Sequence, residues 1–178
     1  KPGDLIFVTG TLGDSSLGLK LLKKKKRTSK DHRFLIQKHL DPTARIKEAG
    51  ILSRSKTSIT SMIDISDGLV QDLYHICKSS KVGAQIHEES LPQSLEFIRT
   101  CNKNLASPLP FILNGGEDYE LLFTLPPDGV KKLNRQFLKA KALVTQIGEI
   151  VLKPKKVSLK LREGTTKTLQ DSEGFNHF

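Results

Sequence analysis

The segment of residues 62–69 places three polar side chains at the end of an apolar run and reads Met-Ile-Asp-Ile-Ser-Asp-Gly-Leu. Side chains of a β-strand alternate between its two faces, so we expect Asp64 and Ser66 on the face opposite to the two isoleucines. Asp67 follows where an amphipathic helix begins, and the N–H groups and dipole of a helix N-terminus favour anions. Magnesium takes oxygen ligands of these kinds and keeps water and phosphate oxygens for its remaining positions. The segment therefore predicts a site for magnesium and a phosphate-bearing ligand.

The same three residues also have a purely structural interpretation. Ser66 or Asp67 would cap the following helix, a role that contributes about 1 kcal/mol, while Asp64 accepts nearby hydrogen bonds. One cap requires one side chain, whereas three polar side chains stand here, and this surplus favours the magnesium and phosphate interpretation. On spacing alone, both interpretations stay open.

A second acidic segment, residues 115–120, reads Gly-Gly-Glu-Asp-Tyr-Glu and leads into an apolar strand. Its glycine pair permits positive φ angles and a close approach of the backbone. Carboxylates such as that of Glu117 are suited to bind a metal ion, or to accept hydrogen bonds from a cationic or amino-bearing substrate. A structural turn explains the same residues equally well, so the segment by itself does not decide its role.

Three further segments favour structural roles. Residues 10–16 superficially suggest a phosphate loop, but they lack the Gly-Lys-Ser/Thr ending and the three-glycine dinucleotide spacing, which favours a tight strand-to-helix connection. The basic run of residues 23–27 has no interleaved aromatic residue, which favours a solvated helix end over a nucleic-acid site. The tail of residues 174–178 carries two phenylalanines, and a docked chain end explains them.

Apolar periodicity predicts the elements that position these segments. Short apolar runs predict strands, at residues 4–9, 59–65, 82–87, 119–125, 142–151 and 157–161. Helical spacing predicts one helix that starts from a cap at Ser15 or Ser16, and further helices near residues 31–40, 43–53, 67–79, 93–103 and 127–138. The alternation has no internal repeats, which predicts an α+β or mixed α/β sandwich with helices over one face of a mixed sheet.

Composition limits the class of protein. The chain has 178 residues, of which 37% are hydrophobic, enough for one sizeable core and one domain. Its 29 basic and 19 acidic residues leave a formal charge of +10, which favours anionic partners such as nucleotides. No apolar run reaches the roughly 18 residues of a membrane-spanning helix, so we expect a soluble protein. Two cysteines cannot form a dense disulfide framework, which favours a reducing cytoplasm. The sequence has no CxxC, HxxxH or HExxH motif, which argues against a dedicated zinc site.

Four segments together resemble the thiamine-monophosphate kinase family in their order and spacing. They are Gly3 and Asp4 with residues 8–10, then residues 62–69, residues 115–123, and the ending Gly-Phe-Asn-His-Phe. The resemblance covers essentially the whole chain. The second and third segments are long and specific, whereas the glycine loop alone is shared with relatives such as the aminoimidazole-ribonucleotide and selenophosphate synthetases.

The resemblance implies an aminoimidazole-ribonucleotide-synthetase-like fold in a protomer of two domains. The N-terminal domain of the family carries most of the nucleotide and metal ligands and forms a homodimer. Residues 1–178 would be a single C-terminal domain, and the N-terminal domain would lie upstream of this chain. The first residue is Lys1 and the only methionine is Met62, which agrees with that expectation. We therefore expect the chain to be inactive alone.

Matching positions imply roles for individual residues. By the resemblance, Asp64 and Asp67 bind Mg²⁺ and Ser66 contacts ATP. Glu117 would contact thiamine monophosphate. Phe175 would flank the thiamine rings, because it occupies the aromatic position of the family's terminal pattern. The next residue is asparagine where the family usually has aspartate, so the chain departs from the pattern there.

The implied reaction moves the γ-phosphoryl group of ATP onto the phosphate of thiamine monophosphate and yields thiamine diphosphate and ADP. The acceptor oxygen is already ionised near neutral pH, so no strong general base is required. Catalysis would depend on alignment and on neutralising the repelling phosphates. Two alternatives remain, another ATP-using member of the superfamily and a basic nucleic-acid-binding module.

Overall fold

The fold is known from a computed structural model, which describes residues 1–25, 29–54, 58–104, 106–152 and 156–170. In these ranges the strands are β1 (Leu5–Thr9), β2 (Ser61–Asp64), β3 (Gly83–His87), β4 (Leu121–Leu125), β5 (Val144–Val151), β6 (Val157–Lys160) and β7 (Thr166–Leu169). The α-helices are α1 (Asp14–Lys23), α2 (Lys30–Leu40), α3 (Ile46–Arg54), α4 (Leu69–Ser80), α5 (Leu95–Asn104), α6 (Leu109–Asn114) and α7 (Val130–Lys139). Short 3₁₀ turns lie at Glu88–Ser90 and Pro127–Gly129.

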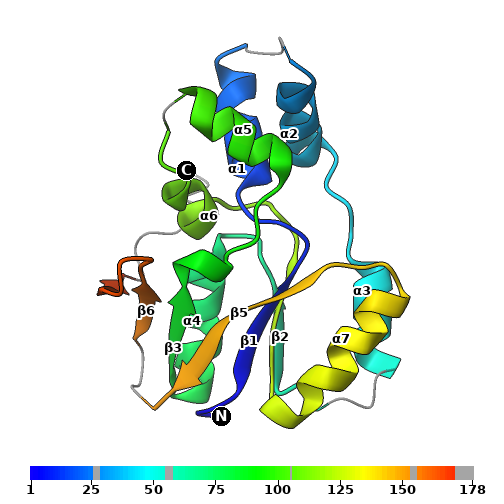
Figure 1. Ribbon diagram of the computed structural model, residues 1–178, viewed down its shortest axis with the longest axis vertical. Helices are drawn as coiled ribbons and strands as arrows, with labels where there is room; N and C mark the ends of the chain where they lie inside the picture. Colours follow the sequence, from blue (N-terminus) through cyan, green and yellow to red (C-terminus); the bar gives the residue numbers. More distant parts are fainter. Residues whose placement is uncertain (26–28, 55–57, 105, 153–155, 171–178) are drawn as a thin grey trace.

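The strands form one mixed sheet, in the order β2-β4-β1-β5-β3-β6-β7. Neighbouring strands run antiparallel except β3 and β6, which are parallel. Figure 1 shows β1 inside the sheet, where it pairs with β4 and β5 from the second half of the chain. The mixed sheet confirms the predicted α+β class, and its strand order brings the end of β2 next to the segment that precedes β4.

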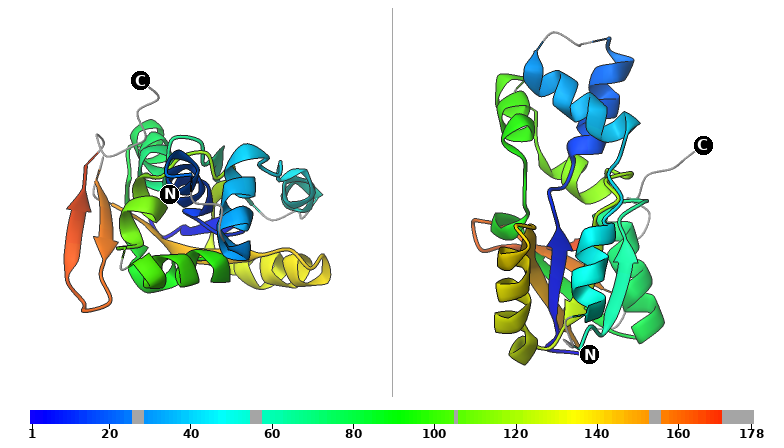
Figure 2. Two further views of the ribbon diagram at one scale, coloured as in Figure 1. Left: turned by 90° about the horizontal axis from the view of Figure 1, so that it is seen from above. Right: turned by 90° about the vertical axis from the view of Figure 1, so that its right-hand side faces the viewer.

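Helices pack against both faces of the sheet. Ile6 and Val8 of β1 belong to the larger apolar core, to which α4 also contributes. Phe7 belongs to a second cluster with Phe137 of α7, and its ring stacks on that of Phe123 with 5.7 Å between the centroids. The right-hand view of Figure 2 shows α4 and α7 on opposite sides of the sheet. The expectation of helices over one face is therefore wrong, because the unbroken apolar run of β1 is typical of a strand buried on both faces.

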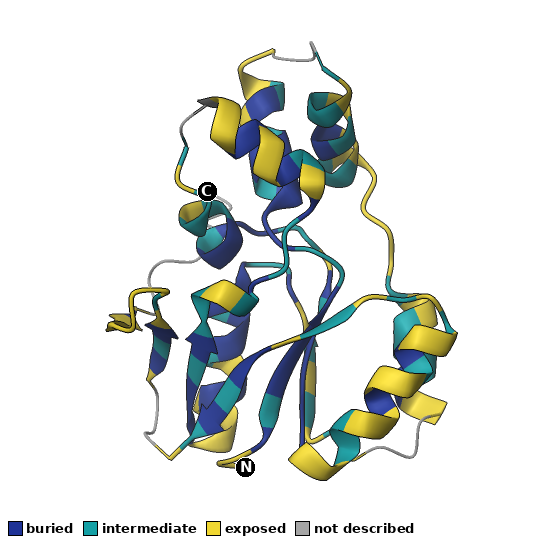
Figure 3. Cartoon of the chain, viewed as in Figure 1, coloured by how far each residue is buried: buried dark blue, intermediate teal, exposed yellow. Residues whose placement is uncertain are grey.

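A second group of helices, α1, α2, α5 and α6, lies beyond the end of the sheet at which β1 stops (Figure 1). α2 packs against both α1 and α5, and the apolar residues between the helices include Leu17, Leu35 and Phe97. In Figure 3 the helices of this group carry both buried and exposed residues, as expected of amphipathic helices that pack against one another. Across the described ranges, we find no helix with the length and apolar character needed to cross a membrane.

Most predicted elements are confirmed, with boundaries that differ by a few residues. Two elements have no counterpart in the prediction: α6, a short helix that contains Pro110, and β7, whose Thr-Lys-Thr start is exposed and lacks apolar alternation. The predicted cap at Ser15 or Ser16 is wrong. α1 begins at Asp14, and its N-cap is Gly13 with a φ of 85°, without a side-chain cap of its own. A carboxylate from the second acidic segment binds the start of α1 instead.

Both cysteines should resist alkylation in the folded protein. Cys77 and Cys101 are free and buried, and burial raises the pKa of the Cys77 thiol to about 11. Because the thiolate is the reactive form, iodoacetamide at mildly alkaline pH should label neither residue in the native protein and both in concentrated urea. Intact-mass measurement counts the added groups. Rapid labelling of either thiol under native conditions would contradict this packing.

Candidate functional site

The two acidic segments lie side by side, because the pairing of β2 with β4 continues beyond the ends of both strands. The Ile65 N–H donates to the Glu120 carbonyl at 2.8 Å, and the Tyr119 N–H donates to the Ile65 carbonyl at 2.9 Å. The Glu117 N–H donates to the Ser66 carbonyl at 2.8 Å. The turn after β2 and the segment before β4 therefore form one hydrogen-bonded unit at the end of the sheet.

The backbone of this unit adopts uncommon conformations. Glu117 and Tyr119 have φ angles of 65° and 50°, in a region that residues with a Cβ rarely occupy. Such strain persists only where surrounding contacts maintain it, and it is frequent at ligand sites. Gly68 has a φ of 122°, and a Cβ at this position would come within 3.1 Å of the backbone of Asn114. Glycine thus allows the turn after β2 to lie against the end of α6.

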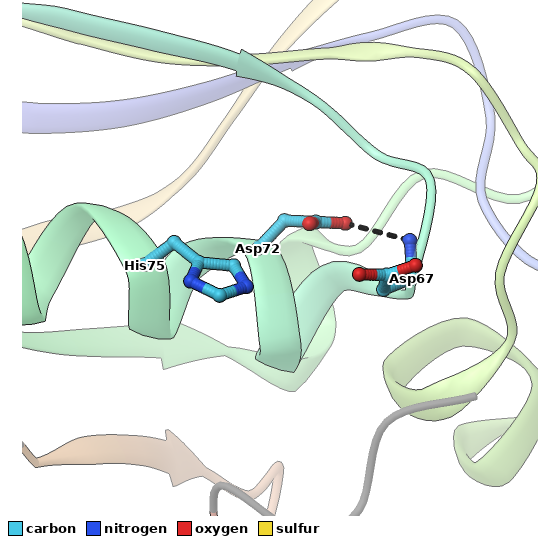
Figure 4. A group of neighbouring side chains, drawn as sticks. All are labelled: Asp67, Asp72 and His75. Atoms are coloured by element: carbon cyan, nitrogen blue, oxygen red, sulfur yellow. Dashed lines mark hydrogen bonds between the residues drawn. The ribbon is translucent and has the colours of Figure 1, made fainter. Parts of the chain in front are cut away.

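Asp72 in the first turn of α4 holds the turn after β2 in place. Its Oδ2 accepts the N–H groups of Ser66, Asp67 and Gly68 at 3.0, 3.1 and 3.2 Å. Figure 4 shows this carboxylate directed at the Asp67 backbone nitrogen. Burial raises the pKa of Asp72, and the backbone N–H groups oppose that shift because they stabilise the ionised form. One buried carboxylate therefore satisfies three successive donors, and the turn needs no cap from Ser66 or Asp67.

Asp67, Asp72 and His75 form a group in which one potential ligand atom from each residue lies within 4.8 Å of the others (Figure 4). The carboxylate of Asp67 is half-buried, and that of Asp64 is exposed at the end of β2. Carboxylate oxygens suit a hard cation such as Mg²⁺, whereas the imidazole of His75 is a better ligand for softer metals. The oxygen donors at this end of the sheet thus fit magnesium.

Asp118 of the second acidic segment has a structural role at the start of α1. Its carboxylate oxygens accept the N–H of Gly13 at 2.7 Å and the N–H of Ser15 at 3.1 Å. Burial raises the pKa of Asp118 to about 8, although both N–H groups act against the shift. Asp118 therefore supplies the cap that α1 lacks. It also links residues 10–16, which connect β1 to α1, to the hydrogen-bonded unit of the two acidic segments, here called the acidic unit.

Glu120 also has a structural role, because its carboxylate is buried in an ion pair. The guanidinium of Arg45 donates two hydrogen bonds to this carboxylate, from Nε to Oε2 at 2.6 Å and from Nη2 to Oε1. Thr9 Oγ1 donates to Oε2 at 2.7 Å. Gly10 leaves room for this carboxylate, since a Cβ there would lie 2.1 Å from Oε1. The ion pair fastens the linker between α2 and α3 to the segment before β4.

Glu117 differs from these two carboxylates because its side chain stays 29% exposed. Its Oε2 lies 3.2 Å from Nδ1 of His39, near the end of α2. The same imidazole nitrogen lies 3.1 Å from the hydroxyl oxygen of Ser15 in α1. Of the three carboxylates in residues 115–120, that of Glu117 is therefore the one placed to meet a ligand.

A cleft of about 480 Å³ opens beside the same unit, next to Gly10 and Thr11. Its lining includes Lys38 and Lys141, the carboxylates of Glu48 and Glu96, and Arg45, which is already paired with Glu120. The cleft therefore carries mixed charge. It lies next to the paired acidic segments at one end of the sheet.

The structure brings together four of the five predicted site residues. Ser66 and Glu117 share a hydrogen bond, Asp67 is the next residue in the same turn, and Asp64 ends the strand before it. Phe175, like the rest of the tail from residue 171, lies outside the described residues.

The sequence interpretation does not include Asp72, His39 or Arg45. A signal for Asp72 exists, since it stands in the first turn of a predicted helix and in reach of the N–H groups before it. His39 and Arg45 carry no such local signal, because they meet the acidic segment only through the packing of α2.

Replacement of Asp72 by alanine should destabilise the protein by about 1–3 kcal/mol, because three backbone donors lose their acceptor, and that of Gly68 is buried. Urea unfolding followed by circular dichroism measures the change. Asp128→Ala removes an exposed carboxylate from a 3₁₀ turn and should leave the midpoint almost unchanged. If both variants unfold at the same urea concentration, Asp72 does not stabilise the turn after β2.

Comparison with known proteins identifies similar chains. The chain matches the family described as AIR synthase related protein, C-terminal domain, over residues 1–160. It is 44% identical over 180 residues to the thiamine-monophosphate kinase of Buchnera aphidicola subsp. Schizaphis graminum, covering 100% of this chain and 54% of that protein. It is 40% identical over 179 residues to the thiamine-monophosphate kinase of Haemophilus influenzae, covering 99% of this chain and 53% of that protein.

A solved structure with the same architecture is AaThiL complexed with AMPPCP and TMP. It superposes with a TM-score of 0.81 at 36% identity, covering 100% of this chain and 52% of that chain. The chain thus spans about half the length of the relatives that it matches. The shared architecture confirms the predicted fold. By sequence and by structure, the chain belongs to the family of AIR synthase related proteins, as their C-terminal domain.

Proposed function

We propose that this chain is the C-terminal half of a kinase that phosphorylates thiamine monophosphate to thiamine diphosphate with ATP. The observation that carries the proposal is the hydrogen-bonded unit in which Ser66 and Glu117 meet, beside a carboxylate-rich turn. The identity to thiamine-monophosphate kinases supports it, as does the similarity to a structure that binds AMPPCP, an analogue of ATP, together with TMP. The other half of the relatives would supply an N-terminal domain with further ligands and the contacts of a homodimer.

The four proposed site residues that the structure describes have roles that fit their places. Asp64 and Asp67 would hold Mg²⁺ with carboxylate oxygens, and Ser66 would contact ATP. Glu117 would accept hydrogen bonds from thiamine monophosphate across the unit. Phe175 would flank the thiamine rings, as the family pattern implies. Two buried free thiols fit a cytoplasmic enzyme, since a reducing compartment keeps cysteines unpaired.

For this reaction the chain has to bind and orient two anions, ATP and thiamine monophosphate. No general base is needed, because the acceptor phosphate is already ionised. Bound magnesium would neutralise part of the charge that makes the two phosphates repel each other. The turn held by Asp72 keeps Asp67 and Ser66 at fixed positions relative to Glu117. Such alignment of nucleotide and acceptor contributes much of the rate in phosphoryl transfer.

Full-length protein that carries this chain should convert ATP and thiamine monophosphate into ADP and thiamine diphosphate, and should do so only with a divalent cation. Chromatography of the thiamine phosphates measures the product. An aminoimidazole precursor or selenide should not stimulate ADP release. ADP release with one of those compounds, and none with thiamine monophosphate, would assign the chain to another branch of the superfamily.

The isolated chain of residues 1–178 should show little or no kinase activity, because the relatives it matches are about twice as long. The assay above, repeated with equal amounts of this chain and of the full-length protein, checks this. Turnover of the chain at the full-length rate would show that no further domain is needed.

A further inference from the structure

His39 lies between the proposed substrate carboxylate and the start of α1. Its Nδ1 is 3.2 Å from Oε2 of Glu117 and 3.1 Å from Oγ of Ser15. The His39 side chain is 13% exposed, against 29% for that of Glu117. The imidazole is thus the more buried partner of this contact, and the carboxylate is the more accessible one.

A favourable contact between His39 and Glu117 places one requirement on the imidazole ring. An ionised carboxylate has only acceptor atoms, so a hydrogen bond between the two groups requires N–H at Nδ1 of His39. At 3.2 Å, the attraction between this nitrogen and the Glu117 carboxylate is mainly electrostatic and is strongest when the imidazole is protonated. The hydroxyl of Ser15 faces the same nitrogen and restricts rotation of the ring. An N–H at Nδ1 faces both the Ser15 hydroxyl, at 3.1 Å, and one oxygen of Glu117, at 3.2 Å, and the second oxygen of that carboxylate stays available.

Glu117 needs such a partner more than an ordinary surface residue does. It follows two glycines, and its side chain has several rotatable bonds beyond Cβ, so the backbone alone does not set where the carboxylate lies. Its N–H is occupied by the Ser66 carbonyl, which fixes the backbone but leaves the carboxylate to rotate about its side-chain bonds.

The segment that carries His39 is itself anchored to the acidic unit. α2 ends at Leu40, and Arg45 a few residues later is bound to the buried carboxylate of Glu120. α2 also packs along α1, whose start is capped by Asp118. The position of His39 is therefore fixed by the packing of α2 on α1 and by the Arg45–Glu120 ion pair that follows α2. A residue held in this way can orient the side chain of Glu117.

We propose that His39 is a positioning residue that orients the carboxylate of Glu117 toward thiamine monophosphate. This inference rests on the proposed function, because it takes Glu117 as the group that meets that substrate. His39 acts through Glu117 and has no part in the transfer of the phosphoryl group. Its loss should therefore weaken the use of thiamine monophosphate and leave the use of ATP nearly unchanged.

The kinetic test uses the full-length protein with His39→Ala, His39→Asn and Gln37→Ala. The first should raise KM for thiamine monophosphate about tenfold, with little change in kcat or in KM for ATP. Asparagine places an amide N–H close to the position of Nδ1, so His39→Asn should recover most of the loss. Gln37→Ala alters an exposed residue on the same helix and should behave like the unmodified protein. Equal effects on both substrates, or no effect of His39→Ala in a folded protein, would overturn the proposal.

A double-mutant cycle separates positioning from a general structural role. Glu117→Ala should raise KM for thiamine monophosphate at least as much as His39→Ala does. Adding His39→Ala to Glu117→Ala should change KM no further, because the group that His39 orients is already absent. If the two substitutions raise KM for thiamine monophosphate by factors that multiply in the double variant, the two residues act independently.

A spectroscopic measurement keeps this test distinct from the test of function. In ¹⁵N-labelled full-length protein, the His39 ring should show a protonated Nδ1, and Glu117→Ala should change its ring signals. If the full-length protein does not phosphorylate thiamine monophosphate, the proposed function fails and the substrate part of this inference fails with it. Ring signals unaffected by Glu117→Ala would overturn the contact itself, even in an active kinase.

Discussion

Asp64→Asn should lower the turnover of the full-length kinase about a hundredfold or more while the protein stays folded. The change keeps the size of the side chain and removes the negative charge that would hold Mg²⁺ beside the phosphates, an interaction worth several kcal/mol in the transition state. Asp64 is exposed at the end of β2, so the substitution disturbs no buried packing. Steady-state ADP release measures the loss, and the melting temperature checks the fold.

The matched control is Asp128→Asn, which neutralises another exposed carboxylate, in the 3₁₀ turn before α7. It should retain full turnover. Raising the magnesium concentration should restore part of the activity of Asp64→Asn if weakened binding of the cation is the cause. Near-normal turnover of Asp64→Asn at limiting magnesium would exclude Asp64 as a ligand.

Arg45→Ala should destabilise this domain by about 3–5 kcal/mol, the largest stability effect that we expect from a single change of a polar residue. The side chain of Glu120 is only 2% exposed, so loss of its cation leaves a buried charge with the Thr9 hydroxyl as its remaining side-chain donor among the described contacts. A desolvated charge without its counter-ion is much more costly than an exposed one. Urea unfolding of the chain measures the change as a lower midpoint.

Two further variants show whether the buried charge is the cause. Glu120→Gln in the Arg45→Ala background removes the unpaired charge and should recover part of the lost stability. Arg99→Ala breaks a surface pair with Asp31, in which the arginine side chain is 54% exposed, and should cost less than about 1 kcal/mol. If Arg45→Ala and Arg99→Ala cost the same, the ion pair of Glu120 does not anchor the linker after α2.

The secondary structure was predictable where apolar periodicity is strong. The run before Thr9 and the helical spacing after Asp67 lie in β1 and α4 as expected. α6 and β7 are short and lack a periodic apolar pattern, so local sequence does not distinguish them from loops. The helices on the second face were predictable in principle, because a strand that is apolar at every position has to be covered on both sides.

The sequence by itself determined the residue types at this end of the sheet. Carboxylates, a hydroxyl and glycines at the ends of apolar strands predict metal and phosphate chemistry, and spacing alone leaves a structural role equally open. Local pattern did not rank the acidic residues of the second segment, and only the family resemblance singled out Glu117. Only the tertiary structure shows that Asp118 caps α1, that Glu120 is paired with Arg45, and that Glu117 remains open beside His39. The physical reason is that a carboxylate is assigned its role by burial and by the donors that surround it, and those donors come from helices distant in the sequence.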